Sequence, residues 1–186
     1  MKKLRFKLVL ALLVFTVLIR EEIYRGLIHY ENDGLRARVL LKNPLLKAEL
    51  DQWVMKQQQA EIELSTRCLI RKSLQITSRE LRPVGSKLAS HTNHILLEGK
   101  ANRTGYSRLF GEVFSYLVEL NGTGHLLMHH HLKGTPKFND WNIPFVTANE
   151  YDYNQVIDVQ RRTVYTLNPL LFDRTGIGIV KVASID

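Results

Sequence analysis

The sequence predicts an α+β fold, in which an N-terminal transmembrane helix precedes helices packed on an antiparallel β-sheet. An uncharged apolar run, Leu8–Ile19, stands near the N-terminus. Further along, apolar residues recur at three- and four-residue intervals, and from Glu61 onward they alternate with polar residues. Helices followed by antiparallel strands are typical of the α+β class. We expect an anchor with a helical extension at 1–30 and a soluble α+β domain at 31–186.

The apolar run is predicted to be an uncleaved membrane anchor. It is shorter than the roughly twenty residues that span a bilayer, but Lys7 and Arg20 can lay their stems along it and keep their charges at the interface. A cleaved signal peptide and a soluble core helix are the alternatives. Residues 16–26 offer no small-residue cleavage site, and a core helix is not usually apolar on every face. The predicted anchor residues are Leu8, Val9, Leu10, Leu12, Leu13, Val14, Phe15, Val17, Leu18 and Ile19.

The positive charge of the chain is concentrated beside this run. The formal net charge is +8, with a pI near 9.7, and the first twenty residues carry +5 of it without a single acid. Residues 21–186 therefore carry only +3, whereas a nucleic-acid-binding domain gathers cations on its folded surface. We expect no nucleic-acid partner. Because basic flanks stay on the cytoplasmic or matrix side, the domain should lie across the membrane, in an intermembrane space, a periplasm or an ER lumen.

Helices are predicted in the first part of the domain. The helical pattern continues from the anchor to about Tyr30, breaks at 31–34 and resumes over 35–42. Asn43 and Pro44 are typical of an N-cap and the first position of a helix, which should run to about Gln59. Its buried face should include Trp53 as a core residue, along with Leu46, Leu50 and Val54.

Strands are predicted from residue 61 onward. Alternation over 61–71 indicates a half-buried strand, and Asn121-Gly122 supplies the positive φ angles of a hairpin turn at 120–124, which contains Gly122 and Gly124. After a loop at 134–140, Trp141, Ile143 and Phe145 should share one strand face. The remaining predicted strands are 94–101, 109–119, 125–133, 156–159, 162–167 and 177–185.

A row of histidines is the most conspicuous cluster of potential ligands. On a strand, His125, His129 and His131 share one face, and histidines two residues apart can bind zinc or copper. No third and fourth ligand is spaced suggestively, so we predict a solvent-facing row of histidines and no metal site. Asp140, Asp152 and Asp158 could be assembled into an acidic site, but any loop-rich domain offers as much.

No motif of a known catalytic site is present in the sequence. The chain lacks a P-loop, a G-x-S-x-G elbow, an H-E-x-x-H pair and a C-x-x-C pair. Its single cysteine, Cys68, excludes an internal disulfide. We therefore expect no cofactor and a binding or assembly protein rather than an enzyme.

Two stretches carry a resemblance to a known family. LLKNPLLKAEL (residues 40–50) and LVELNGTGHLLMHHHLKGTPKFNDWNIPFV (residues 117–146) resemble the mitochondrial family of the cytochrome oxidase assembly factor and the small intermembrane-space subunit of the presequence translocase. In that family a Gly-bearing turn between two strands is followed by a loop and a tryptophan opening the next strand. Here Gly122, Gly124 and Trp141 occupy those places.

The resemblance implies a non-catalytic assembly factor or accessory subunit of a respiratory-chain complex. Such a protein is single-pass in the mitochondrial inner membrane, with its domain in the intermembrane space. Its partners would be subunits of that complex and the lipid bilayer. The alternative is a bacterial inner-membrane protein whose periplasmic domain is a scaffold in a secretion or transport system.

Overall fold

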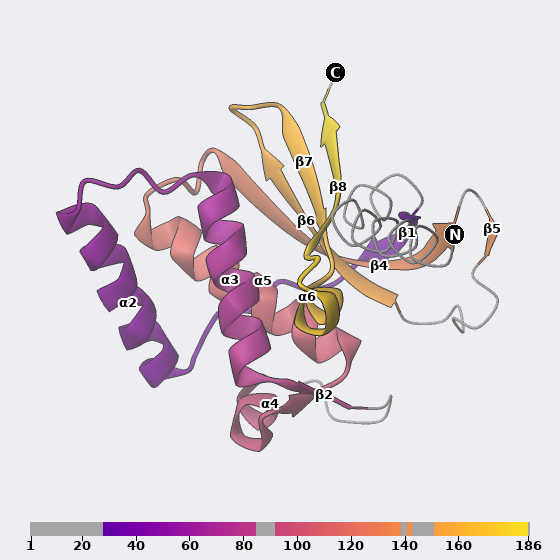
Figure 1. Ribbon diagram of the computed structural model, residues 1–186, viewed down its shortest axis with the longest axis horizontal. Coiled ribbons are helices and arrows are strands. Elements are labelled where there is room, and N and C mark those ends of the chain that lie inside the picture. The colour runs from indigo at the N-terminus through magenta and orange to yellow at the C-terminus, as the bar shows by residue number, and fades with distance from the viewer. Residues whose placement is uncertain (1–27, 85–91, 139–140, 143–150, 186) are drawn as a thin grey trace, which may run out of the picture.

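An antiparallel sheet with helices against one face makes up the described part of the chain (Figure 1). The computed structural model describes residues 28–84, 92–138, 141–142 and 151–185. Within them the main sheet has the order β1-β4-β6-β7-β8, and β5 pairs with β4. Its strands are β1 (Ile28–Leu35), β4 (Leu127–Phe138), β5 (Trp141–Asn142), β6 (Tyr151–Asp158), β7 (Thr163–Leu167) and β8 (Ile179–Ser184). The α+β class with an antiparallel sheet is confirmed.

The helices form a layer in which α5 is central. It contacts β4 and β6 on one side and α3 on the other, while α2 lies at the outer edge of the layer (Figure 1). A small parallel pair, β2 (Arg82–Pro83) with β3 (Lys100–Ala101), follows α3 and precedes α5 in the chain, with α4 between its two strands. The helices are α2 (Pro44–Gln59), α3 (Thr66–Glu80), α4 (Thr92–Glu98), α5 (Arg103–Leu120) and α6 (Pro169–Thr175).

Helix α2 begins and ends where the sequence predicts. The Asn43 side chain accepts a hydrogen bond from the Leu46 amide at 3.0 Å, and Pro44 occupies the first turn, where its missing N–H removes no helical bond. Leu50 on the predicted face is fully buried. Trp53 is half-buried, packs against the core and lies under the Lys72 ammonium, 5.3 Å from its ring centre.

The predicted strand at 61–71 is wrong, because Thr66–Glu80 forms helix α3. Its buried face includes Ser73 and Thr77, which alternation counts as polar. In the helix, the Ser73 hydroxyl donates to the Leu69 carbonyl and the Thr77 hydroxyl to the Ser73 carbonyl, both at 2.8 Å. Because these bonds satisfy the two hydroxyls locally, the face can be buried.

The predicted strand at 109–119 is also wrong, since it lies within helix α5. The segment is apolar on most sides because helix α3 covers one side of α5 and the sheet covers the other. The predicted hairpin turn therefore joins a helix to a strand. Gly122 does adopt a positive φ of 69°, directly after Asn121, which caps the C-terminal end of the helix. Gly124 has open space around its α-carbon.

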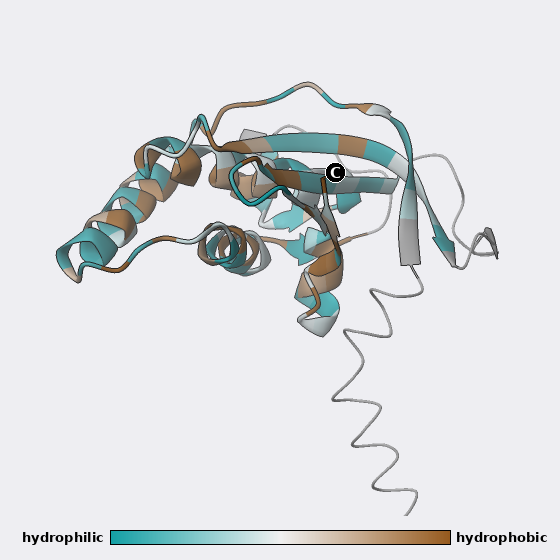
Figure 2. Cartoon of the chain, turned by 90° about the horizontal axis from the view of Figure 1, so that it is seen from above, coloured by the Kyte–Doolittle hydropathy of each residue, from teal (hydrophilic) through white to brown (hydrophobic). Residues whose placement is uncertain are grey.

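The segment before α2 also differs from the prediction. Residues 28–30 belong to β1 rather than to a helix, and 36–43 is extended rather than helical. β1 pairs with residues 132–138 of β4, a partner about a hundred positions away in the chain that local periodicity cannot indicate. Figure 2 shows the extended segment running along one side of the sheet to α2, with apolar and polar residues mixed along it.

The C-terminal strands largely follow the prediction. β4, β6, β7 and β8 overlap the predicted strands at 125–133, 156–159, 162–167 and 177–185, although helix α6 intervenes before the last. β4 continues to Phe138 through the predicted loop, and the predicted strand at 94–101 is mostly helix α4. Trp141 lies in β5, opposite Phe138, whereas Ile143 and Phe145 fall outside the described residues.

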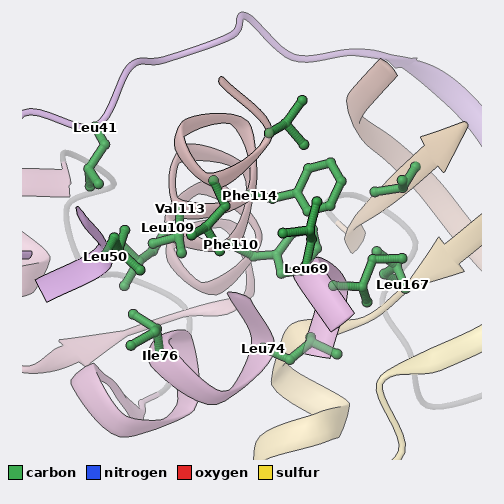
Figure 3. Close-up of a cluster of buried hydrophobic side chains, with 14 of the residues drawn as sticks. Leu41, Leu50, Leu69, Leu74, Ile76, Leu109, Phe110, Val113, Phe114 and Leu167 are labelled. Atoms are coloured by element: carbon green, nitrogen blue, oxygen red, sulfur yellow. The ribbon is translucent and has the colours of Figure 1, made fainter. Parts of the chain in front are cut away.

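The main hydrophobic core lies between α5 and its neighbours (Figure 3). Phe110 and Phe114 stack on successive turns of α5, with ring centres 5.8 Å apart, and both are fully buried. Leu50 of α2, Leu69 of α3 and Leu167 of β7 surround this helix. Burial of each such side chain contributes about 1.5–3 kcal/mol to the free energy of folding. Because these side chains pack around α5, this helix organises the helical layer.

The predicted anchor, 8–19, lies outside the described residues. Among the helices that are described, none combines the length and the apolar character needed to cross a bilayer.

Candidate functional site

A pocket of about 220 Å³ lies where α5, β4 and the start of the extended segment meet. We call it the α5–β4 pocket. It is lined by residues 35–39, by Arg108, Gly111 and Glu112 of α5, and by residues 129–131 of β4. The sheet register and the packing of α5 therefore bring together residues that are distant in the sequence.

His129 is held between α5 and the sheet by a close approach to Gly111. A Cβ atom at Gly111 would lie 2.3 Å from the His129 Cε1 atom, so only glycine leaves room for the ring. The ring lies between Phe110 and Phe114, 6.0 Å from each ring centre. Its Nε2 atom is 2.8 Å from the Asn154 side-chain oxygen. The imidazole is thus held by Gly111, the two phenylalanine rings and Asn154, and it also lines the pocket.

Burial is the main cause of a low pKa at His129, about 4. The hydrogen bond with Asn154 opposes the shift, and the nearby His131, His130 and Arg38 add to it in that order. The ring is therefore neutral near pH 7. A neutral imidazole that bonds Asn154 through one nitrogen serves as a wall of the pocket rather than as a cation.

His131 belongs to a buried polar cluster with Asp152 and Arg36. Its Nε2 atom lies 3.7 Å from Asp152 Oδ2, and the Arg36 Nε atom donates to Asp152 Oδ1 at 3.1 Å. Burial alone would raise the pKa of Asp152, but interactions with His131, Thr104 and Arg36 outweigh burial and lower it. Asp152 is therefore an anion under the pocket wall, and it ties the extended segment to β6.

The solvent-facing row of histidines is wrong for two of its three members. His129 and His131 share a face, as predicted, but that face is covered by α5, and His131 is only 7% exposed. His125 precedes β4 and is exposed, so it does not join them. Among the described residues, no group of three or more His, Cys, Asp or Glu side chains is placed to hold a metal ion.

The aspartates that the sequence analysis set aside as an acidic site are not brought together in the described residues. Asp152 and Asp158 stand at opposite ends of β6 with different partners, since Asp158 accepts a hydrogen bond from the Thr66 hydroxyl at 2.5 Å. Asp140 lies outside the described residues.

Sequence reasoning missed most of the pocket. The helix predicted over 35–42 contains Arg36 and Arg38, and Arg108, Gly111 and Glu112 stand on or next to the segment 109–119 that the sequence predicts to be a strand. One signal is present in the sequence: Asp152 and Asn154 are polar residues two apart, and both are buried in β6, although they lie before the strand predicted at 156–159. Buried polar residues need partners, which here come from β4 and from the segment after β1.

The fold and the pocket define the class of this molecule, an α+β domain with a pocket of apolar and charged residues between its central helix and its sheet. In comparisons with known proteins, no family model, no curated protein and no solved structure matches the chain.

Proposed function

We propose that the protein is a non-catalytic, membrane-anchored accessory subunit or assembly factor of a membrane protein complex. The observation that carries this proposal is the short connection between the apolar run and the folded domain. The run ends at Ile19 and β1 begins at Ile28, so only residues 20–27 intervene. At about 3.3–3.6 Å for each extended residue, that connection reaches no further than roughly 30 Å. An anchored domain would therefore work at the membrane surface.

Exposed apolar side chains support a protein partner close to that surface. Leu35, Leu40 and Leu45 are 68%, 61% and 81% exposed and follow one another along the chain from β1 to the start of α2. Single exposed apolar residues are common, but a series on one segment is typical of a contact surface. We propose that this series contacts a subunit of the complex.

The proposed setting is the mitochondrial inner membrane, with the domain in the intermembrane space and a respiratory-chain complex as the partner. What supports it is the resemblance around Asn43-Pro44 together with the basic N-terminal flank. The turn that contains Gly122 does not lie between two strands, so that element gives the family assignment no support. A bacterial inner membrane with a periplasmic scaffold domain is the second setting, because the same anchor and charge pattern suit it.

Native-membrane purification tests the proposal. The full chain, its Leu40→Ser/Leu45→Ser variant and a Leu97→Ser control are extracted in mild detergent and resolved by native electrophoresis. Leu97 is 88% exposed but lies on α4, away from this segment. We expect the parent and the control to co-migrate with a larger complex and the double variant to be released from it. A parent chain that runs alone would contradict the assembly role.

The anchor is tested separately by alkaline extraction of membranes. Leu12→Lys/Phe15→Lys places two charges within the apolar run, at a cost of about 2.5–3.5 kcal/mol each at the centre of a membrane helix. We expect the parent to stay in the membrane pellet and the variant to be released. A parent that is itself released by alkali would contradict anchoring.

A further inference from the structure

We propose that the α5–β4 pocket binds a small organic monoanion, a carboxylate with a short apolar body. This proposal does not rest on the membrane role proposed above, although Leu35 belongs to both surfaces. The proposal rests on the size of the pocket, the balance of charges around it and a buried histidine in its wall.

The size of the pocket limits the ligand to a short molecule. Its volume of about 220 Å³ corresponds to roughly seven water molecules at liquid density. Leu35, Ala37 and Val39 line one side, and the α-carbon of Gly111 contributes to another. A chain of a few carbon atoms can therefore cover these apolar surfaces while its polar end meets the charged residues.

The charges around the pocket leave one positive charge in excess. Arg36, Arg38 and Arg108 line it, and Glu112 in its wall and Asp152 behind it are the matching acids. Three cations against two anions leave a net charge of +1, which a single carboxylate neutralises. A neutral ligand would leave that charge unmatched.

Arg38 is the cation best placed to meet a ligand. It is exposed at the pocket, and it also lines a neighbouring cavity of about 520 Å³ between β4 and the end of α5. It makes no hydrogen bond or ion pair with any other residue in the described ranges, whereas Arg36 is held by Asp152. Its guanidinium can therefore turn to a carboxylate and bind both oxygens.

His131 supplies the buried polar group. It is more than nine-tenths buried and lines the pocket, and its Nε2 atom faces Asp152 Oδ2 at 3.7 Å, beyond hydrogen-bond distance. The imidazole and the Asp152 carboxylate together form a fixed polar wall, beside which the carboxylate of a ligand can meet the Arg38 guanidinium. The neutral His129, fixed by Asn154, completes this wall.

Pentanoate and pentanamide form a matched pair of probes. Each has about seven non-hydrogen atoms and the same apolar chain, but only pentanoate carries a charge. We expect the full chain, purified in an uncharged detergent, to bind pentanoate at least about tenfold more tightly than pentanamide by calorimetry, after subtraction of heats from empty micelles. The side-chain NMR signals of His129 and His131 should shift with the same saturation.

Arg38→Gln should weaken pentanoate binding about fivefold, because the exposed guanidinium makes a partly screened charge-assisted contact. Arg82→Gln, an exposed arginine on β2 that does not line the pocket, removes the same charge and should leave the dissociation constant within about twofold. Equal affinity for the two probes, no saturable pentanoate binding up to about 10 mM, or equal losses in both variants would each overturn the proposal.

Discussion

At the scale of single residues, the close contact of Gly111 with His129 determines the chemistry of the pocket. Glycine inside a helix costs up to about 1 kcal/mol relative to alanine. Here it lets α5 approach the sheet until the imidazole ring touches the helix backbone. The ring is then buried among Phe110, Phe114 and Asn154, which keeps it neutral. The absence of a Cβ atom at Gly111 thus allows the burial that keeps His129 neutral.

This burial predicts a pH-dependent stability. The pKa of His129 is about 4 in the folded protein and 6.5 in the absence of the fold. Between about pH 7 and pH 5 the unfolded chain takes up a proton at His129 that the folded chain does not, so the free energy of unfolding should fall by about 2 kcal/mol. Urea titrations across this range measure the loss.

Replacing the ring separates His129 from the other histidines. His129→Gln keeps a donor for Asn154 but cannot titrate, so its stability should fall about 2 kcal/mol less than that of the parent over the same range. His94→Gln removes an exposed histidine on α4 and serves as the control. A pH dependence that is the same in all three proteins would contradict a buried, neutral His129.

At the scale of secondary-structure elements, side-chain caps define where helices begin. Asparagine accepts a hydrogen bond from the backbone amide three residues on at the start of α2, α5 and α6, each time at 3.0 Å. These contacts are local in sequence. The start of α2 could therefore be predicted, and the same sign at Asn102 and Asn168 would have indicated helices α5 and α6.

Removal of the cap at α2 should be measurable. Asn43→Ala is expected to lower the free energy of unfolding by about 1 kcal/mol, because the Leu46 amide loses its acceptor. Asn43→Asp keeps an oxygen acceptor at that place and should stay close to the parent. Denaturant unfolding measures all three proteins. If alanine and aspartate were equally destabilising, the loss would not come from the cap.

At the scale of the whole molecule, buried polar contacts join elements that are far apart in the chain. The Tyr106 hydroxyl of α5 donates to the Leu81 carbonyl at the end of α3, at 2.8 Å, and lies 3.1 Å from an Asp173 oxygen on α6. Arg36 and Asp152 likewise join the segment after β1 to β6. Such contacts hold the helical layer and the sheet in one arrangement.

Tyr106→Phe tests this connection between helices. The side chain is fully buried, so loss of the hydroxyl leaves the Leu81 carbonyl without that donor and should cost about 1–3 kcal/mol. Tyr165→Phe is the control, since the Tyr165 ring is also buried but its hydroxyl makes no hydrogen bond with any described residue. Thermal unfolding compares the two. Equal effects would show that the Tyr106 hydroxyl does not stabilise the helical layer.

The sequence by itself determined the elements that depend on neighbouring residues. Asn43 and Pro44 start α2 through a bond within one turn, and Gly122 takes a positive φ wherever the chain goes next. Alternation placed strands at β4, β6, β7 and β8, because their two faces meet different surroundings. These features were sufficient for the α+β class, although the predicted order of helices and strands was wrong before residue 121.

Only the tertiary structure decided the identity of α3, α5 and β1, and with them the pocket. α5 is apolar on several sides because other elements surround it. Ser73 and Thr77 are polar residues on the buried face of α3, so the sequence does not show the helical pattern of that face. β1 is a strand because β4 pairs with it across the chain. Packing and pairing between distant residues set these structures, so the polar cluster around His131 could not be assembled from local patterns.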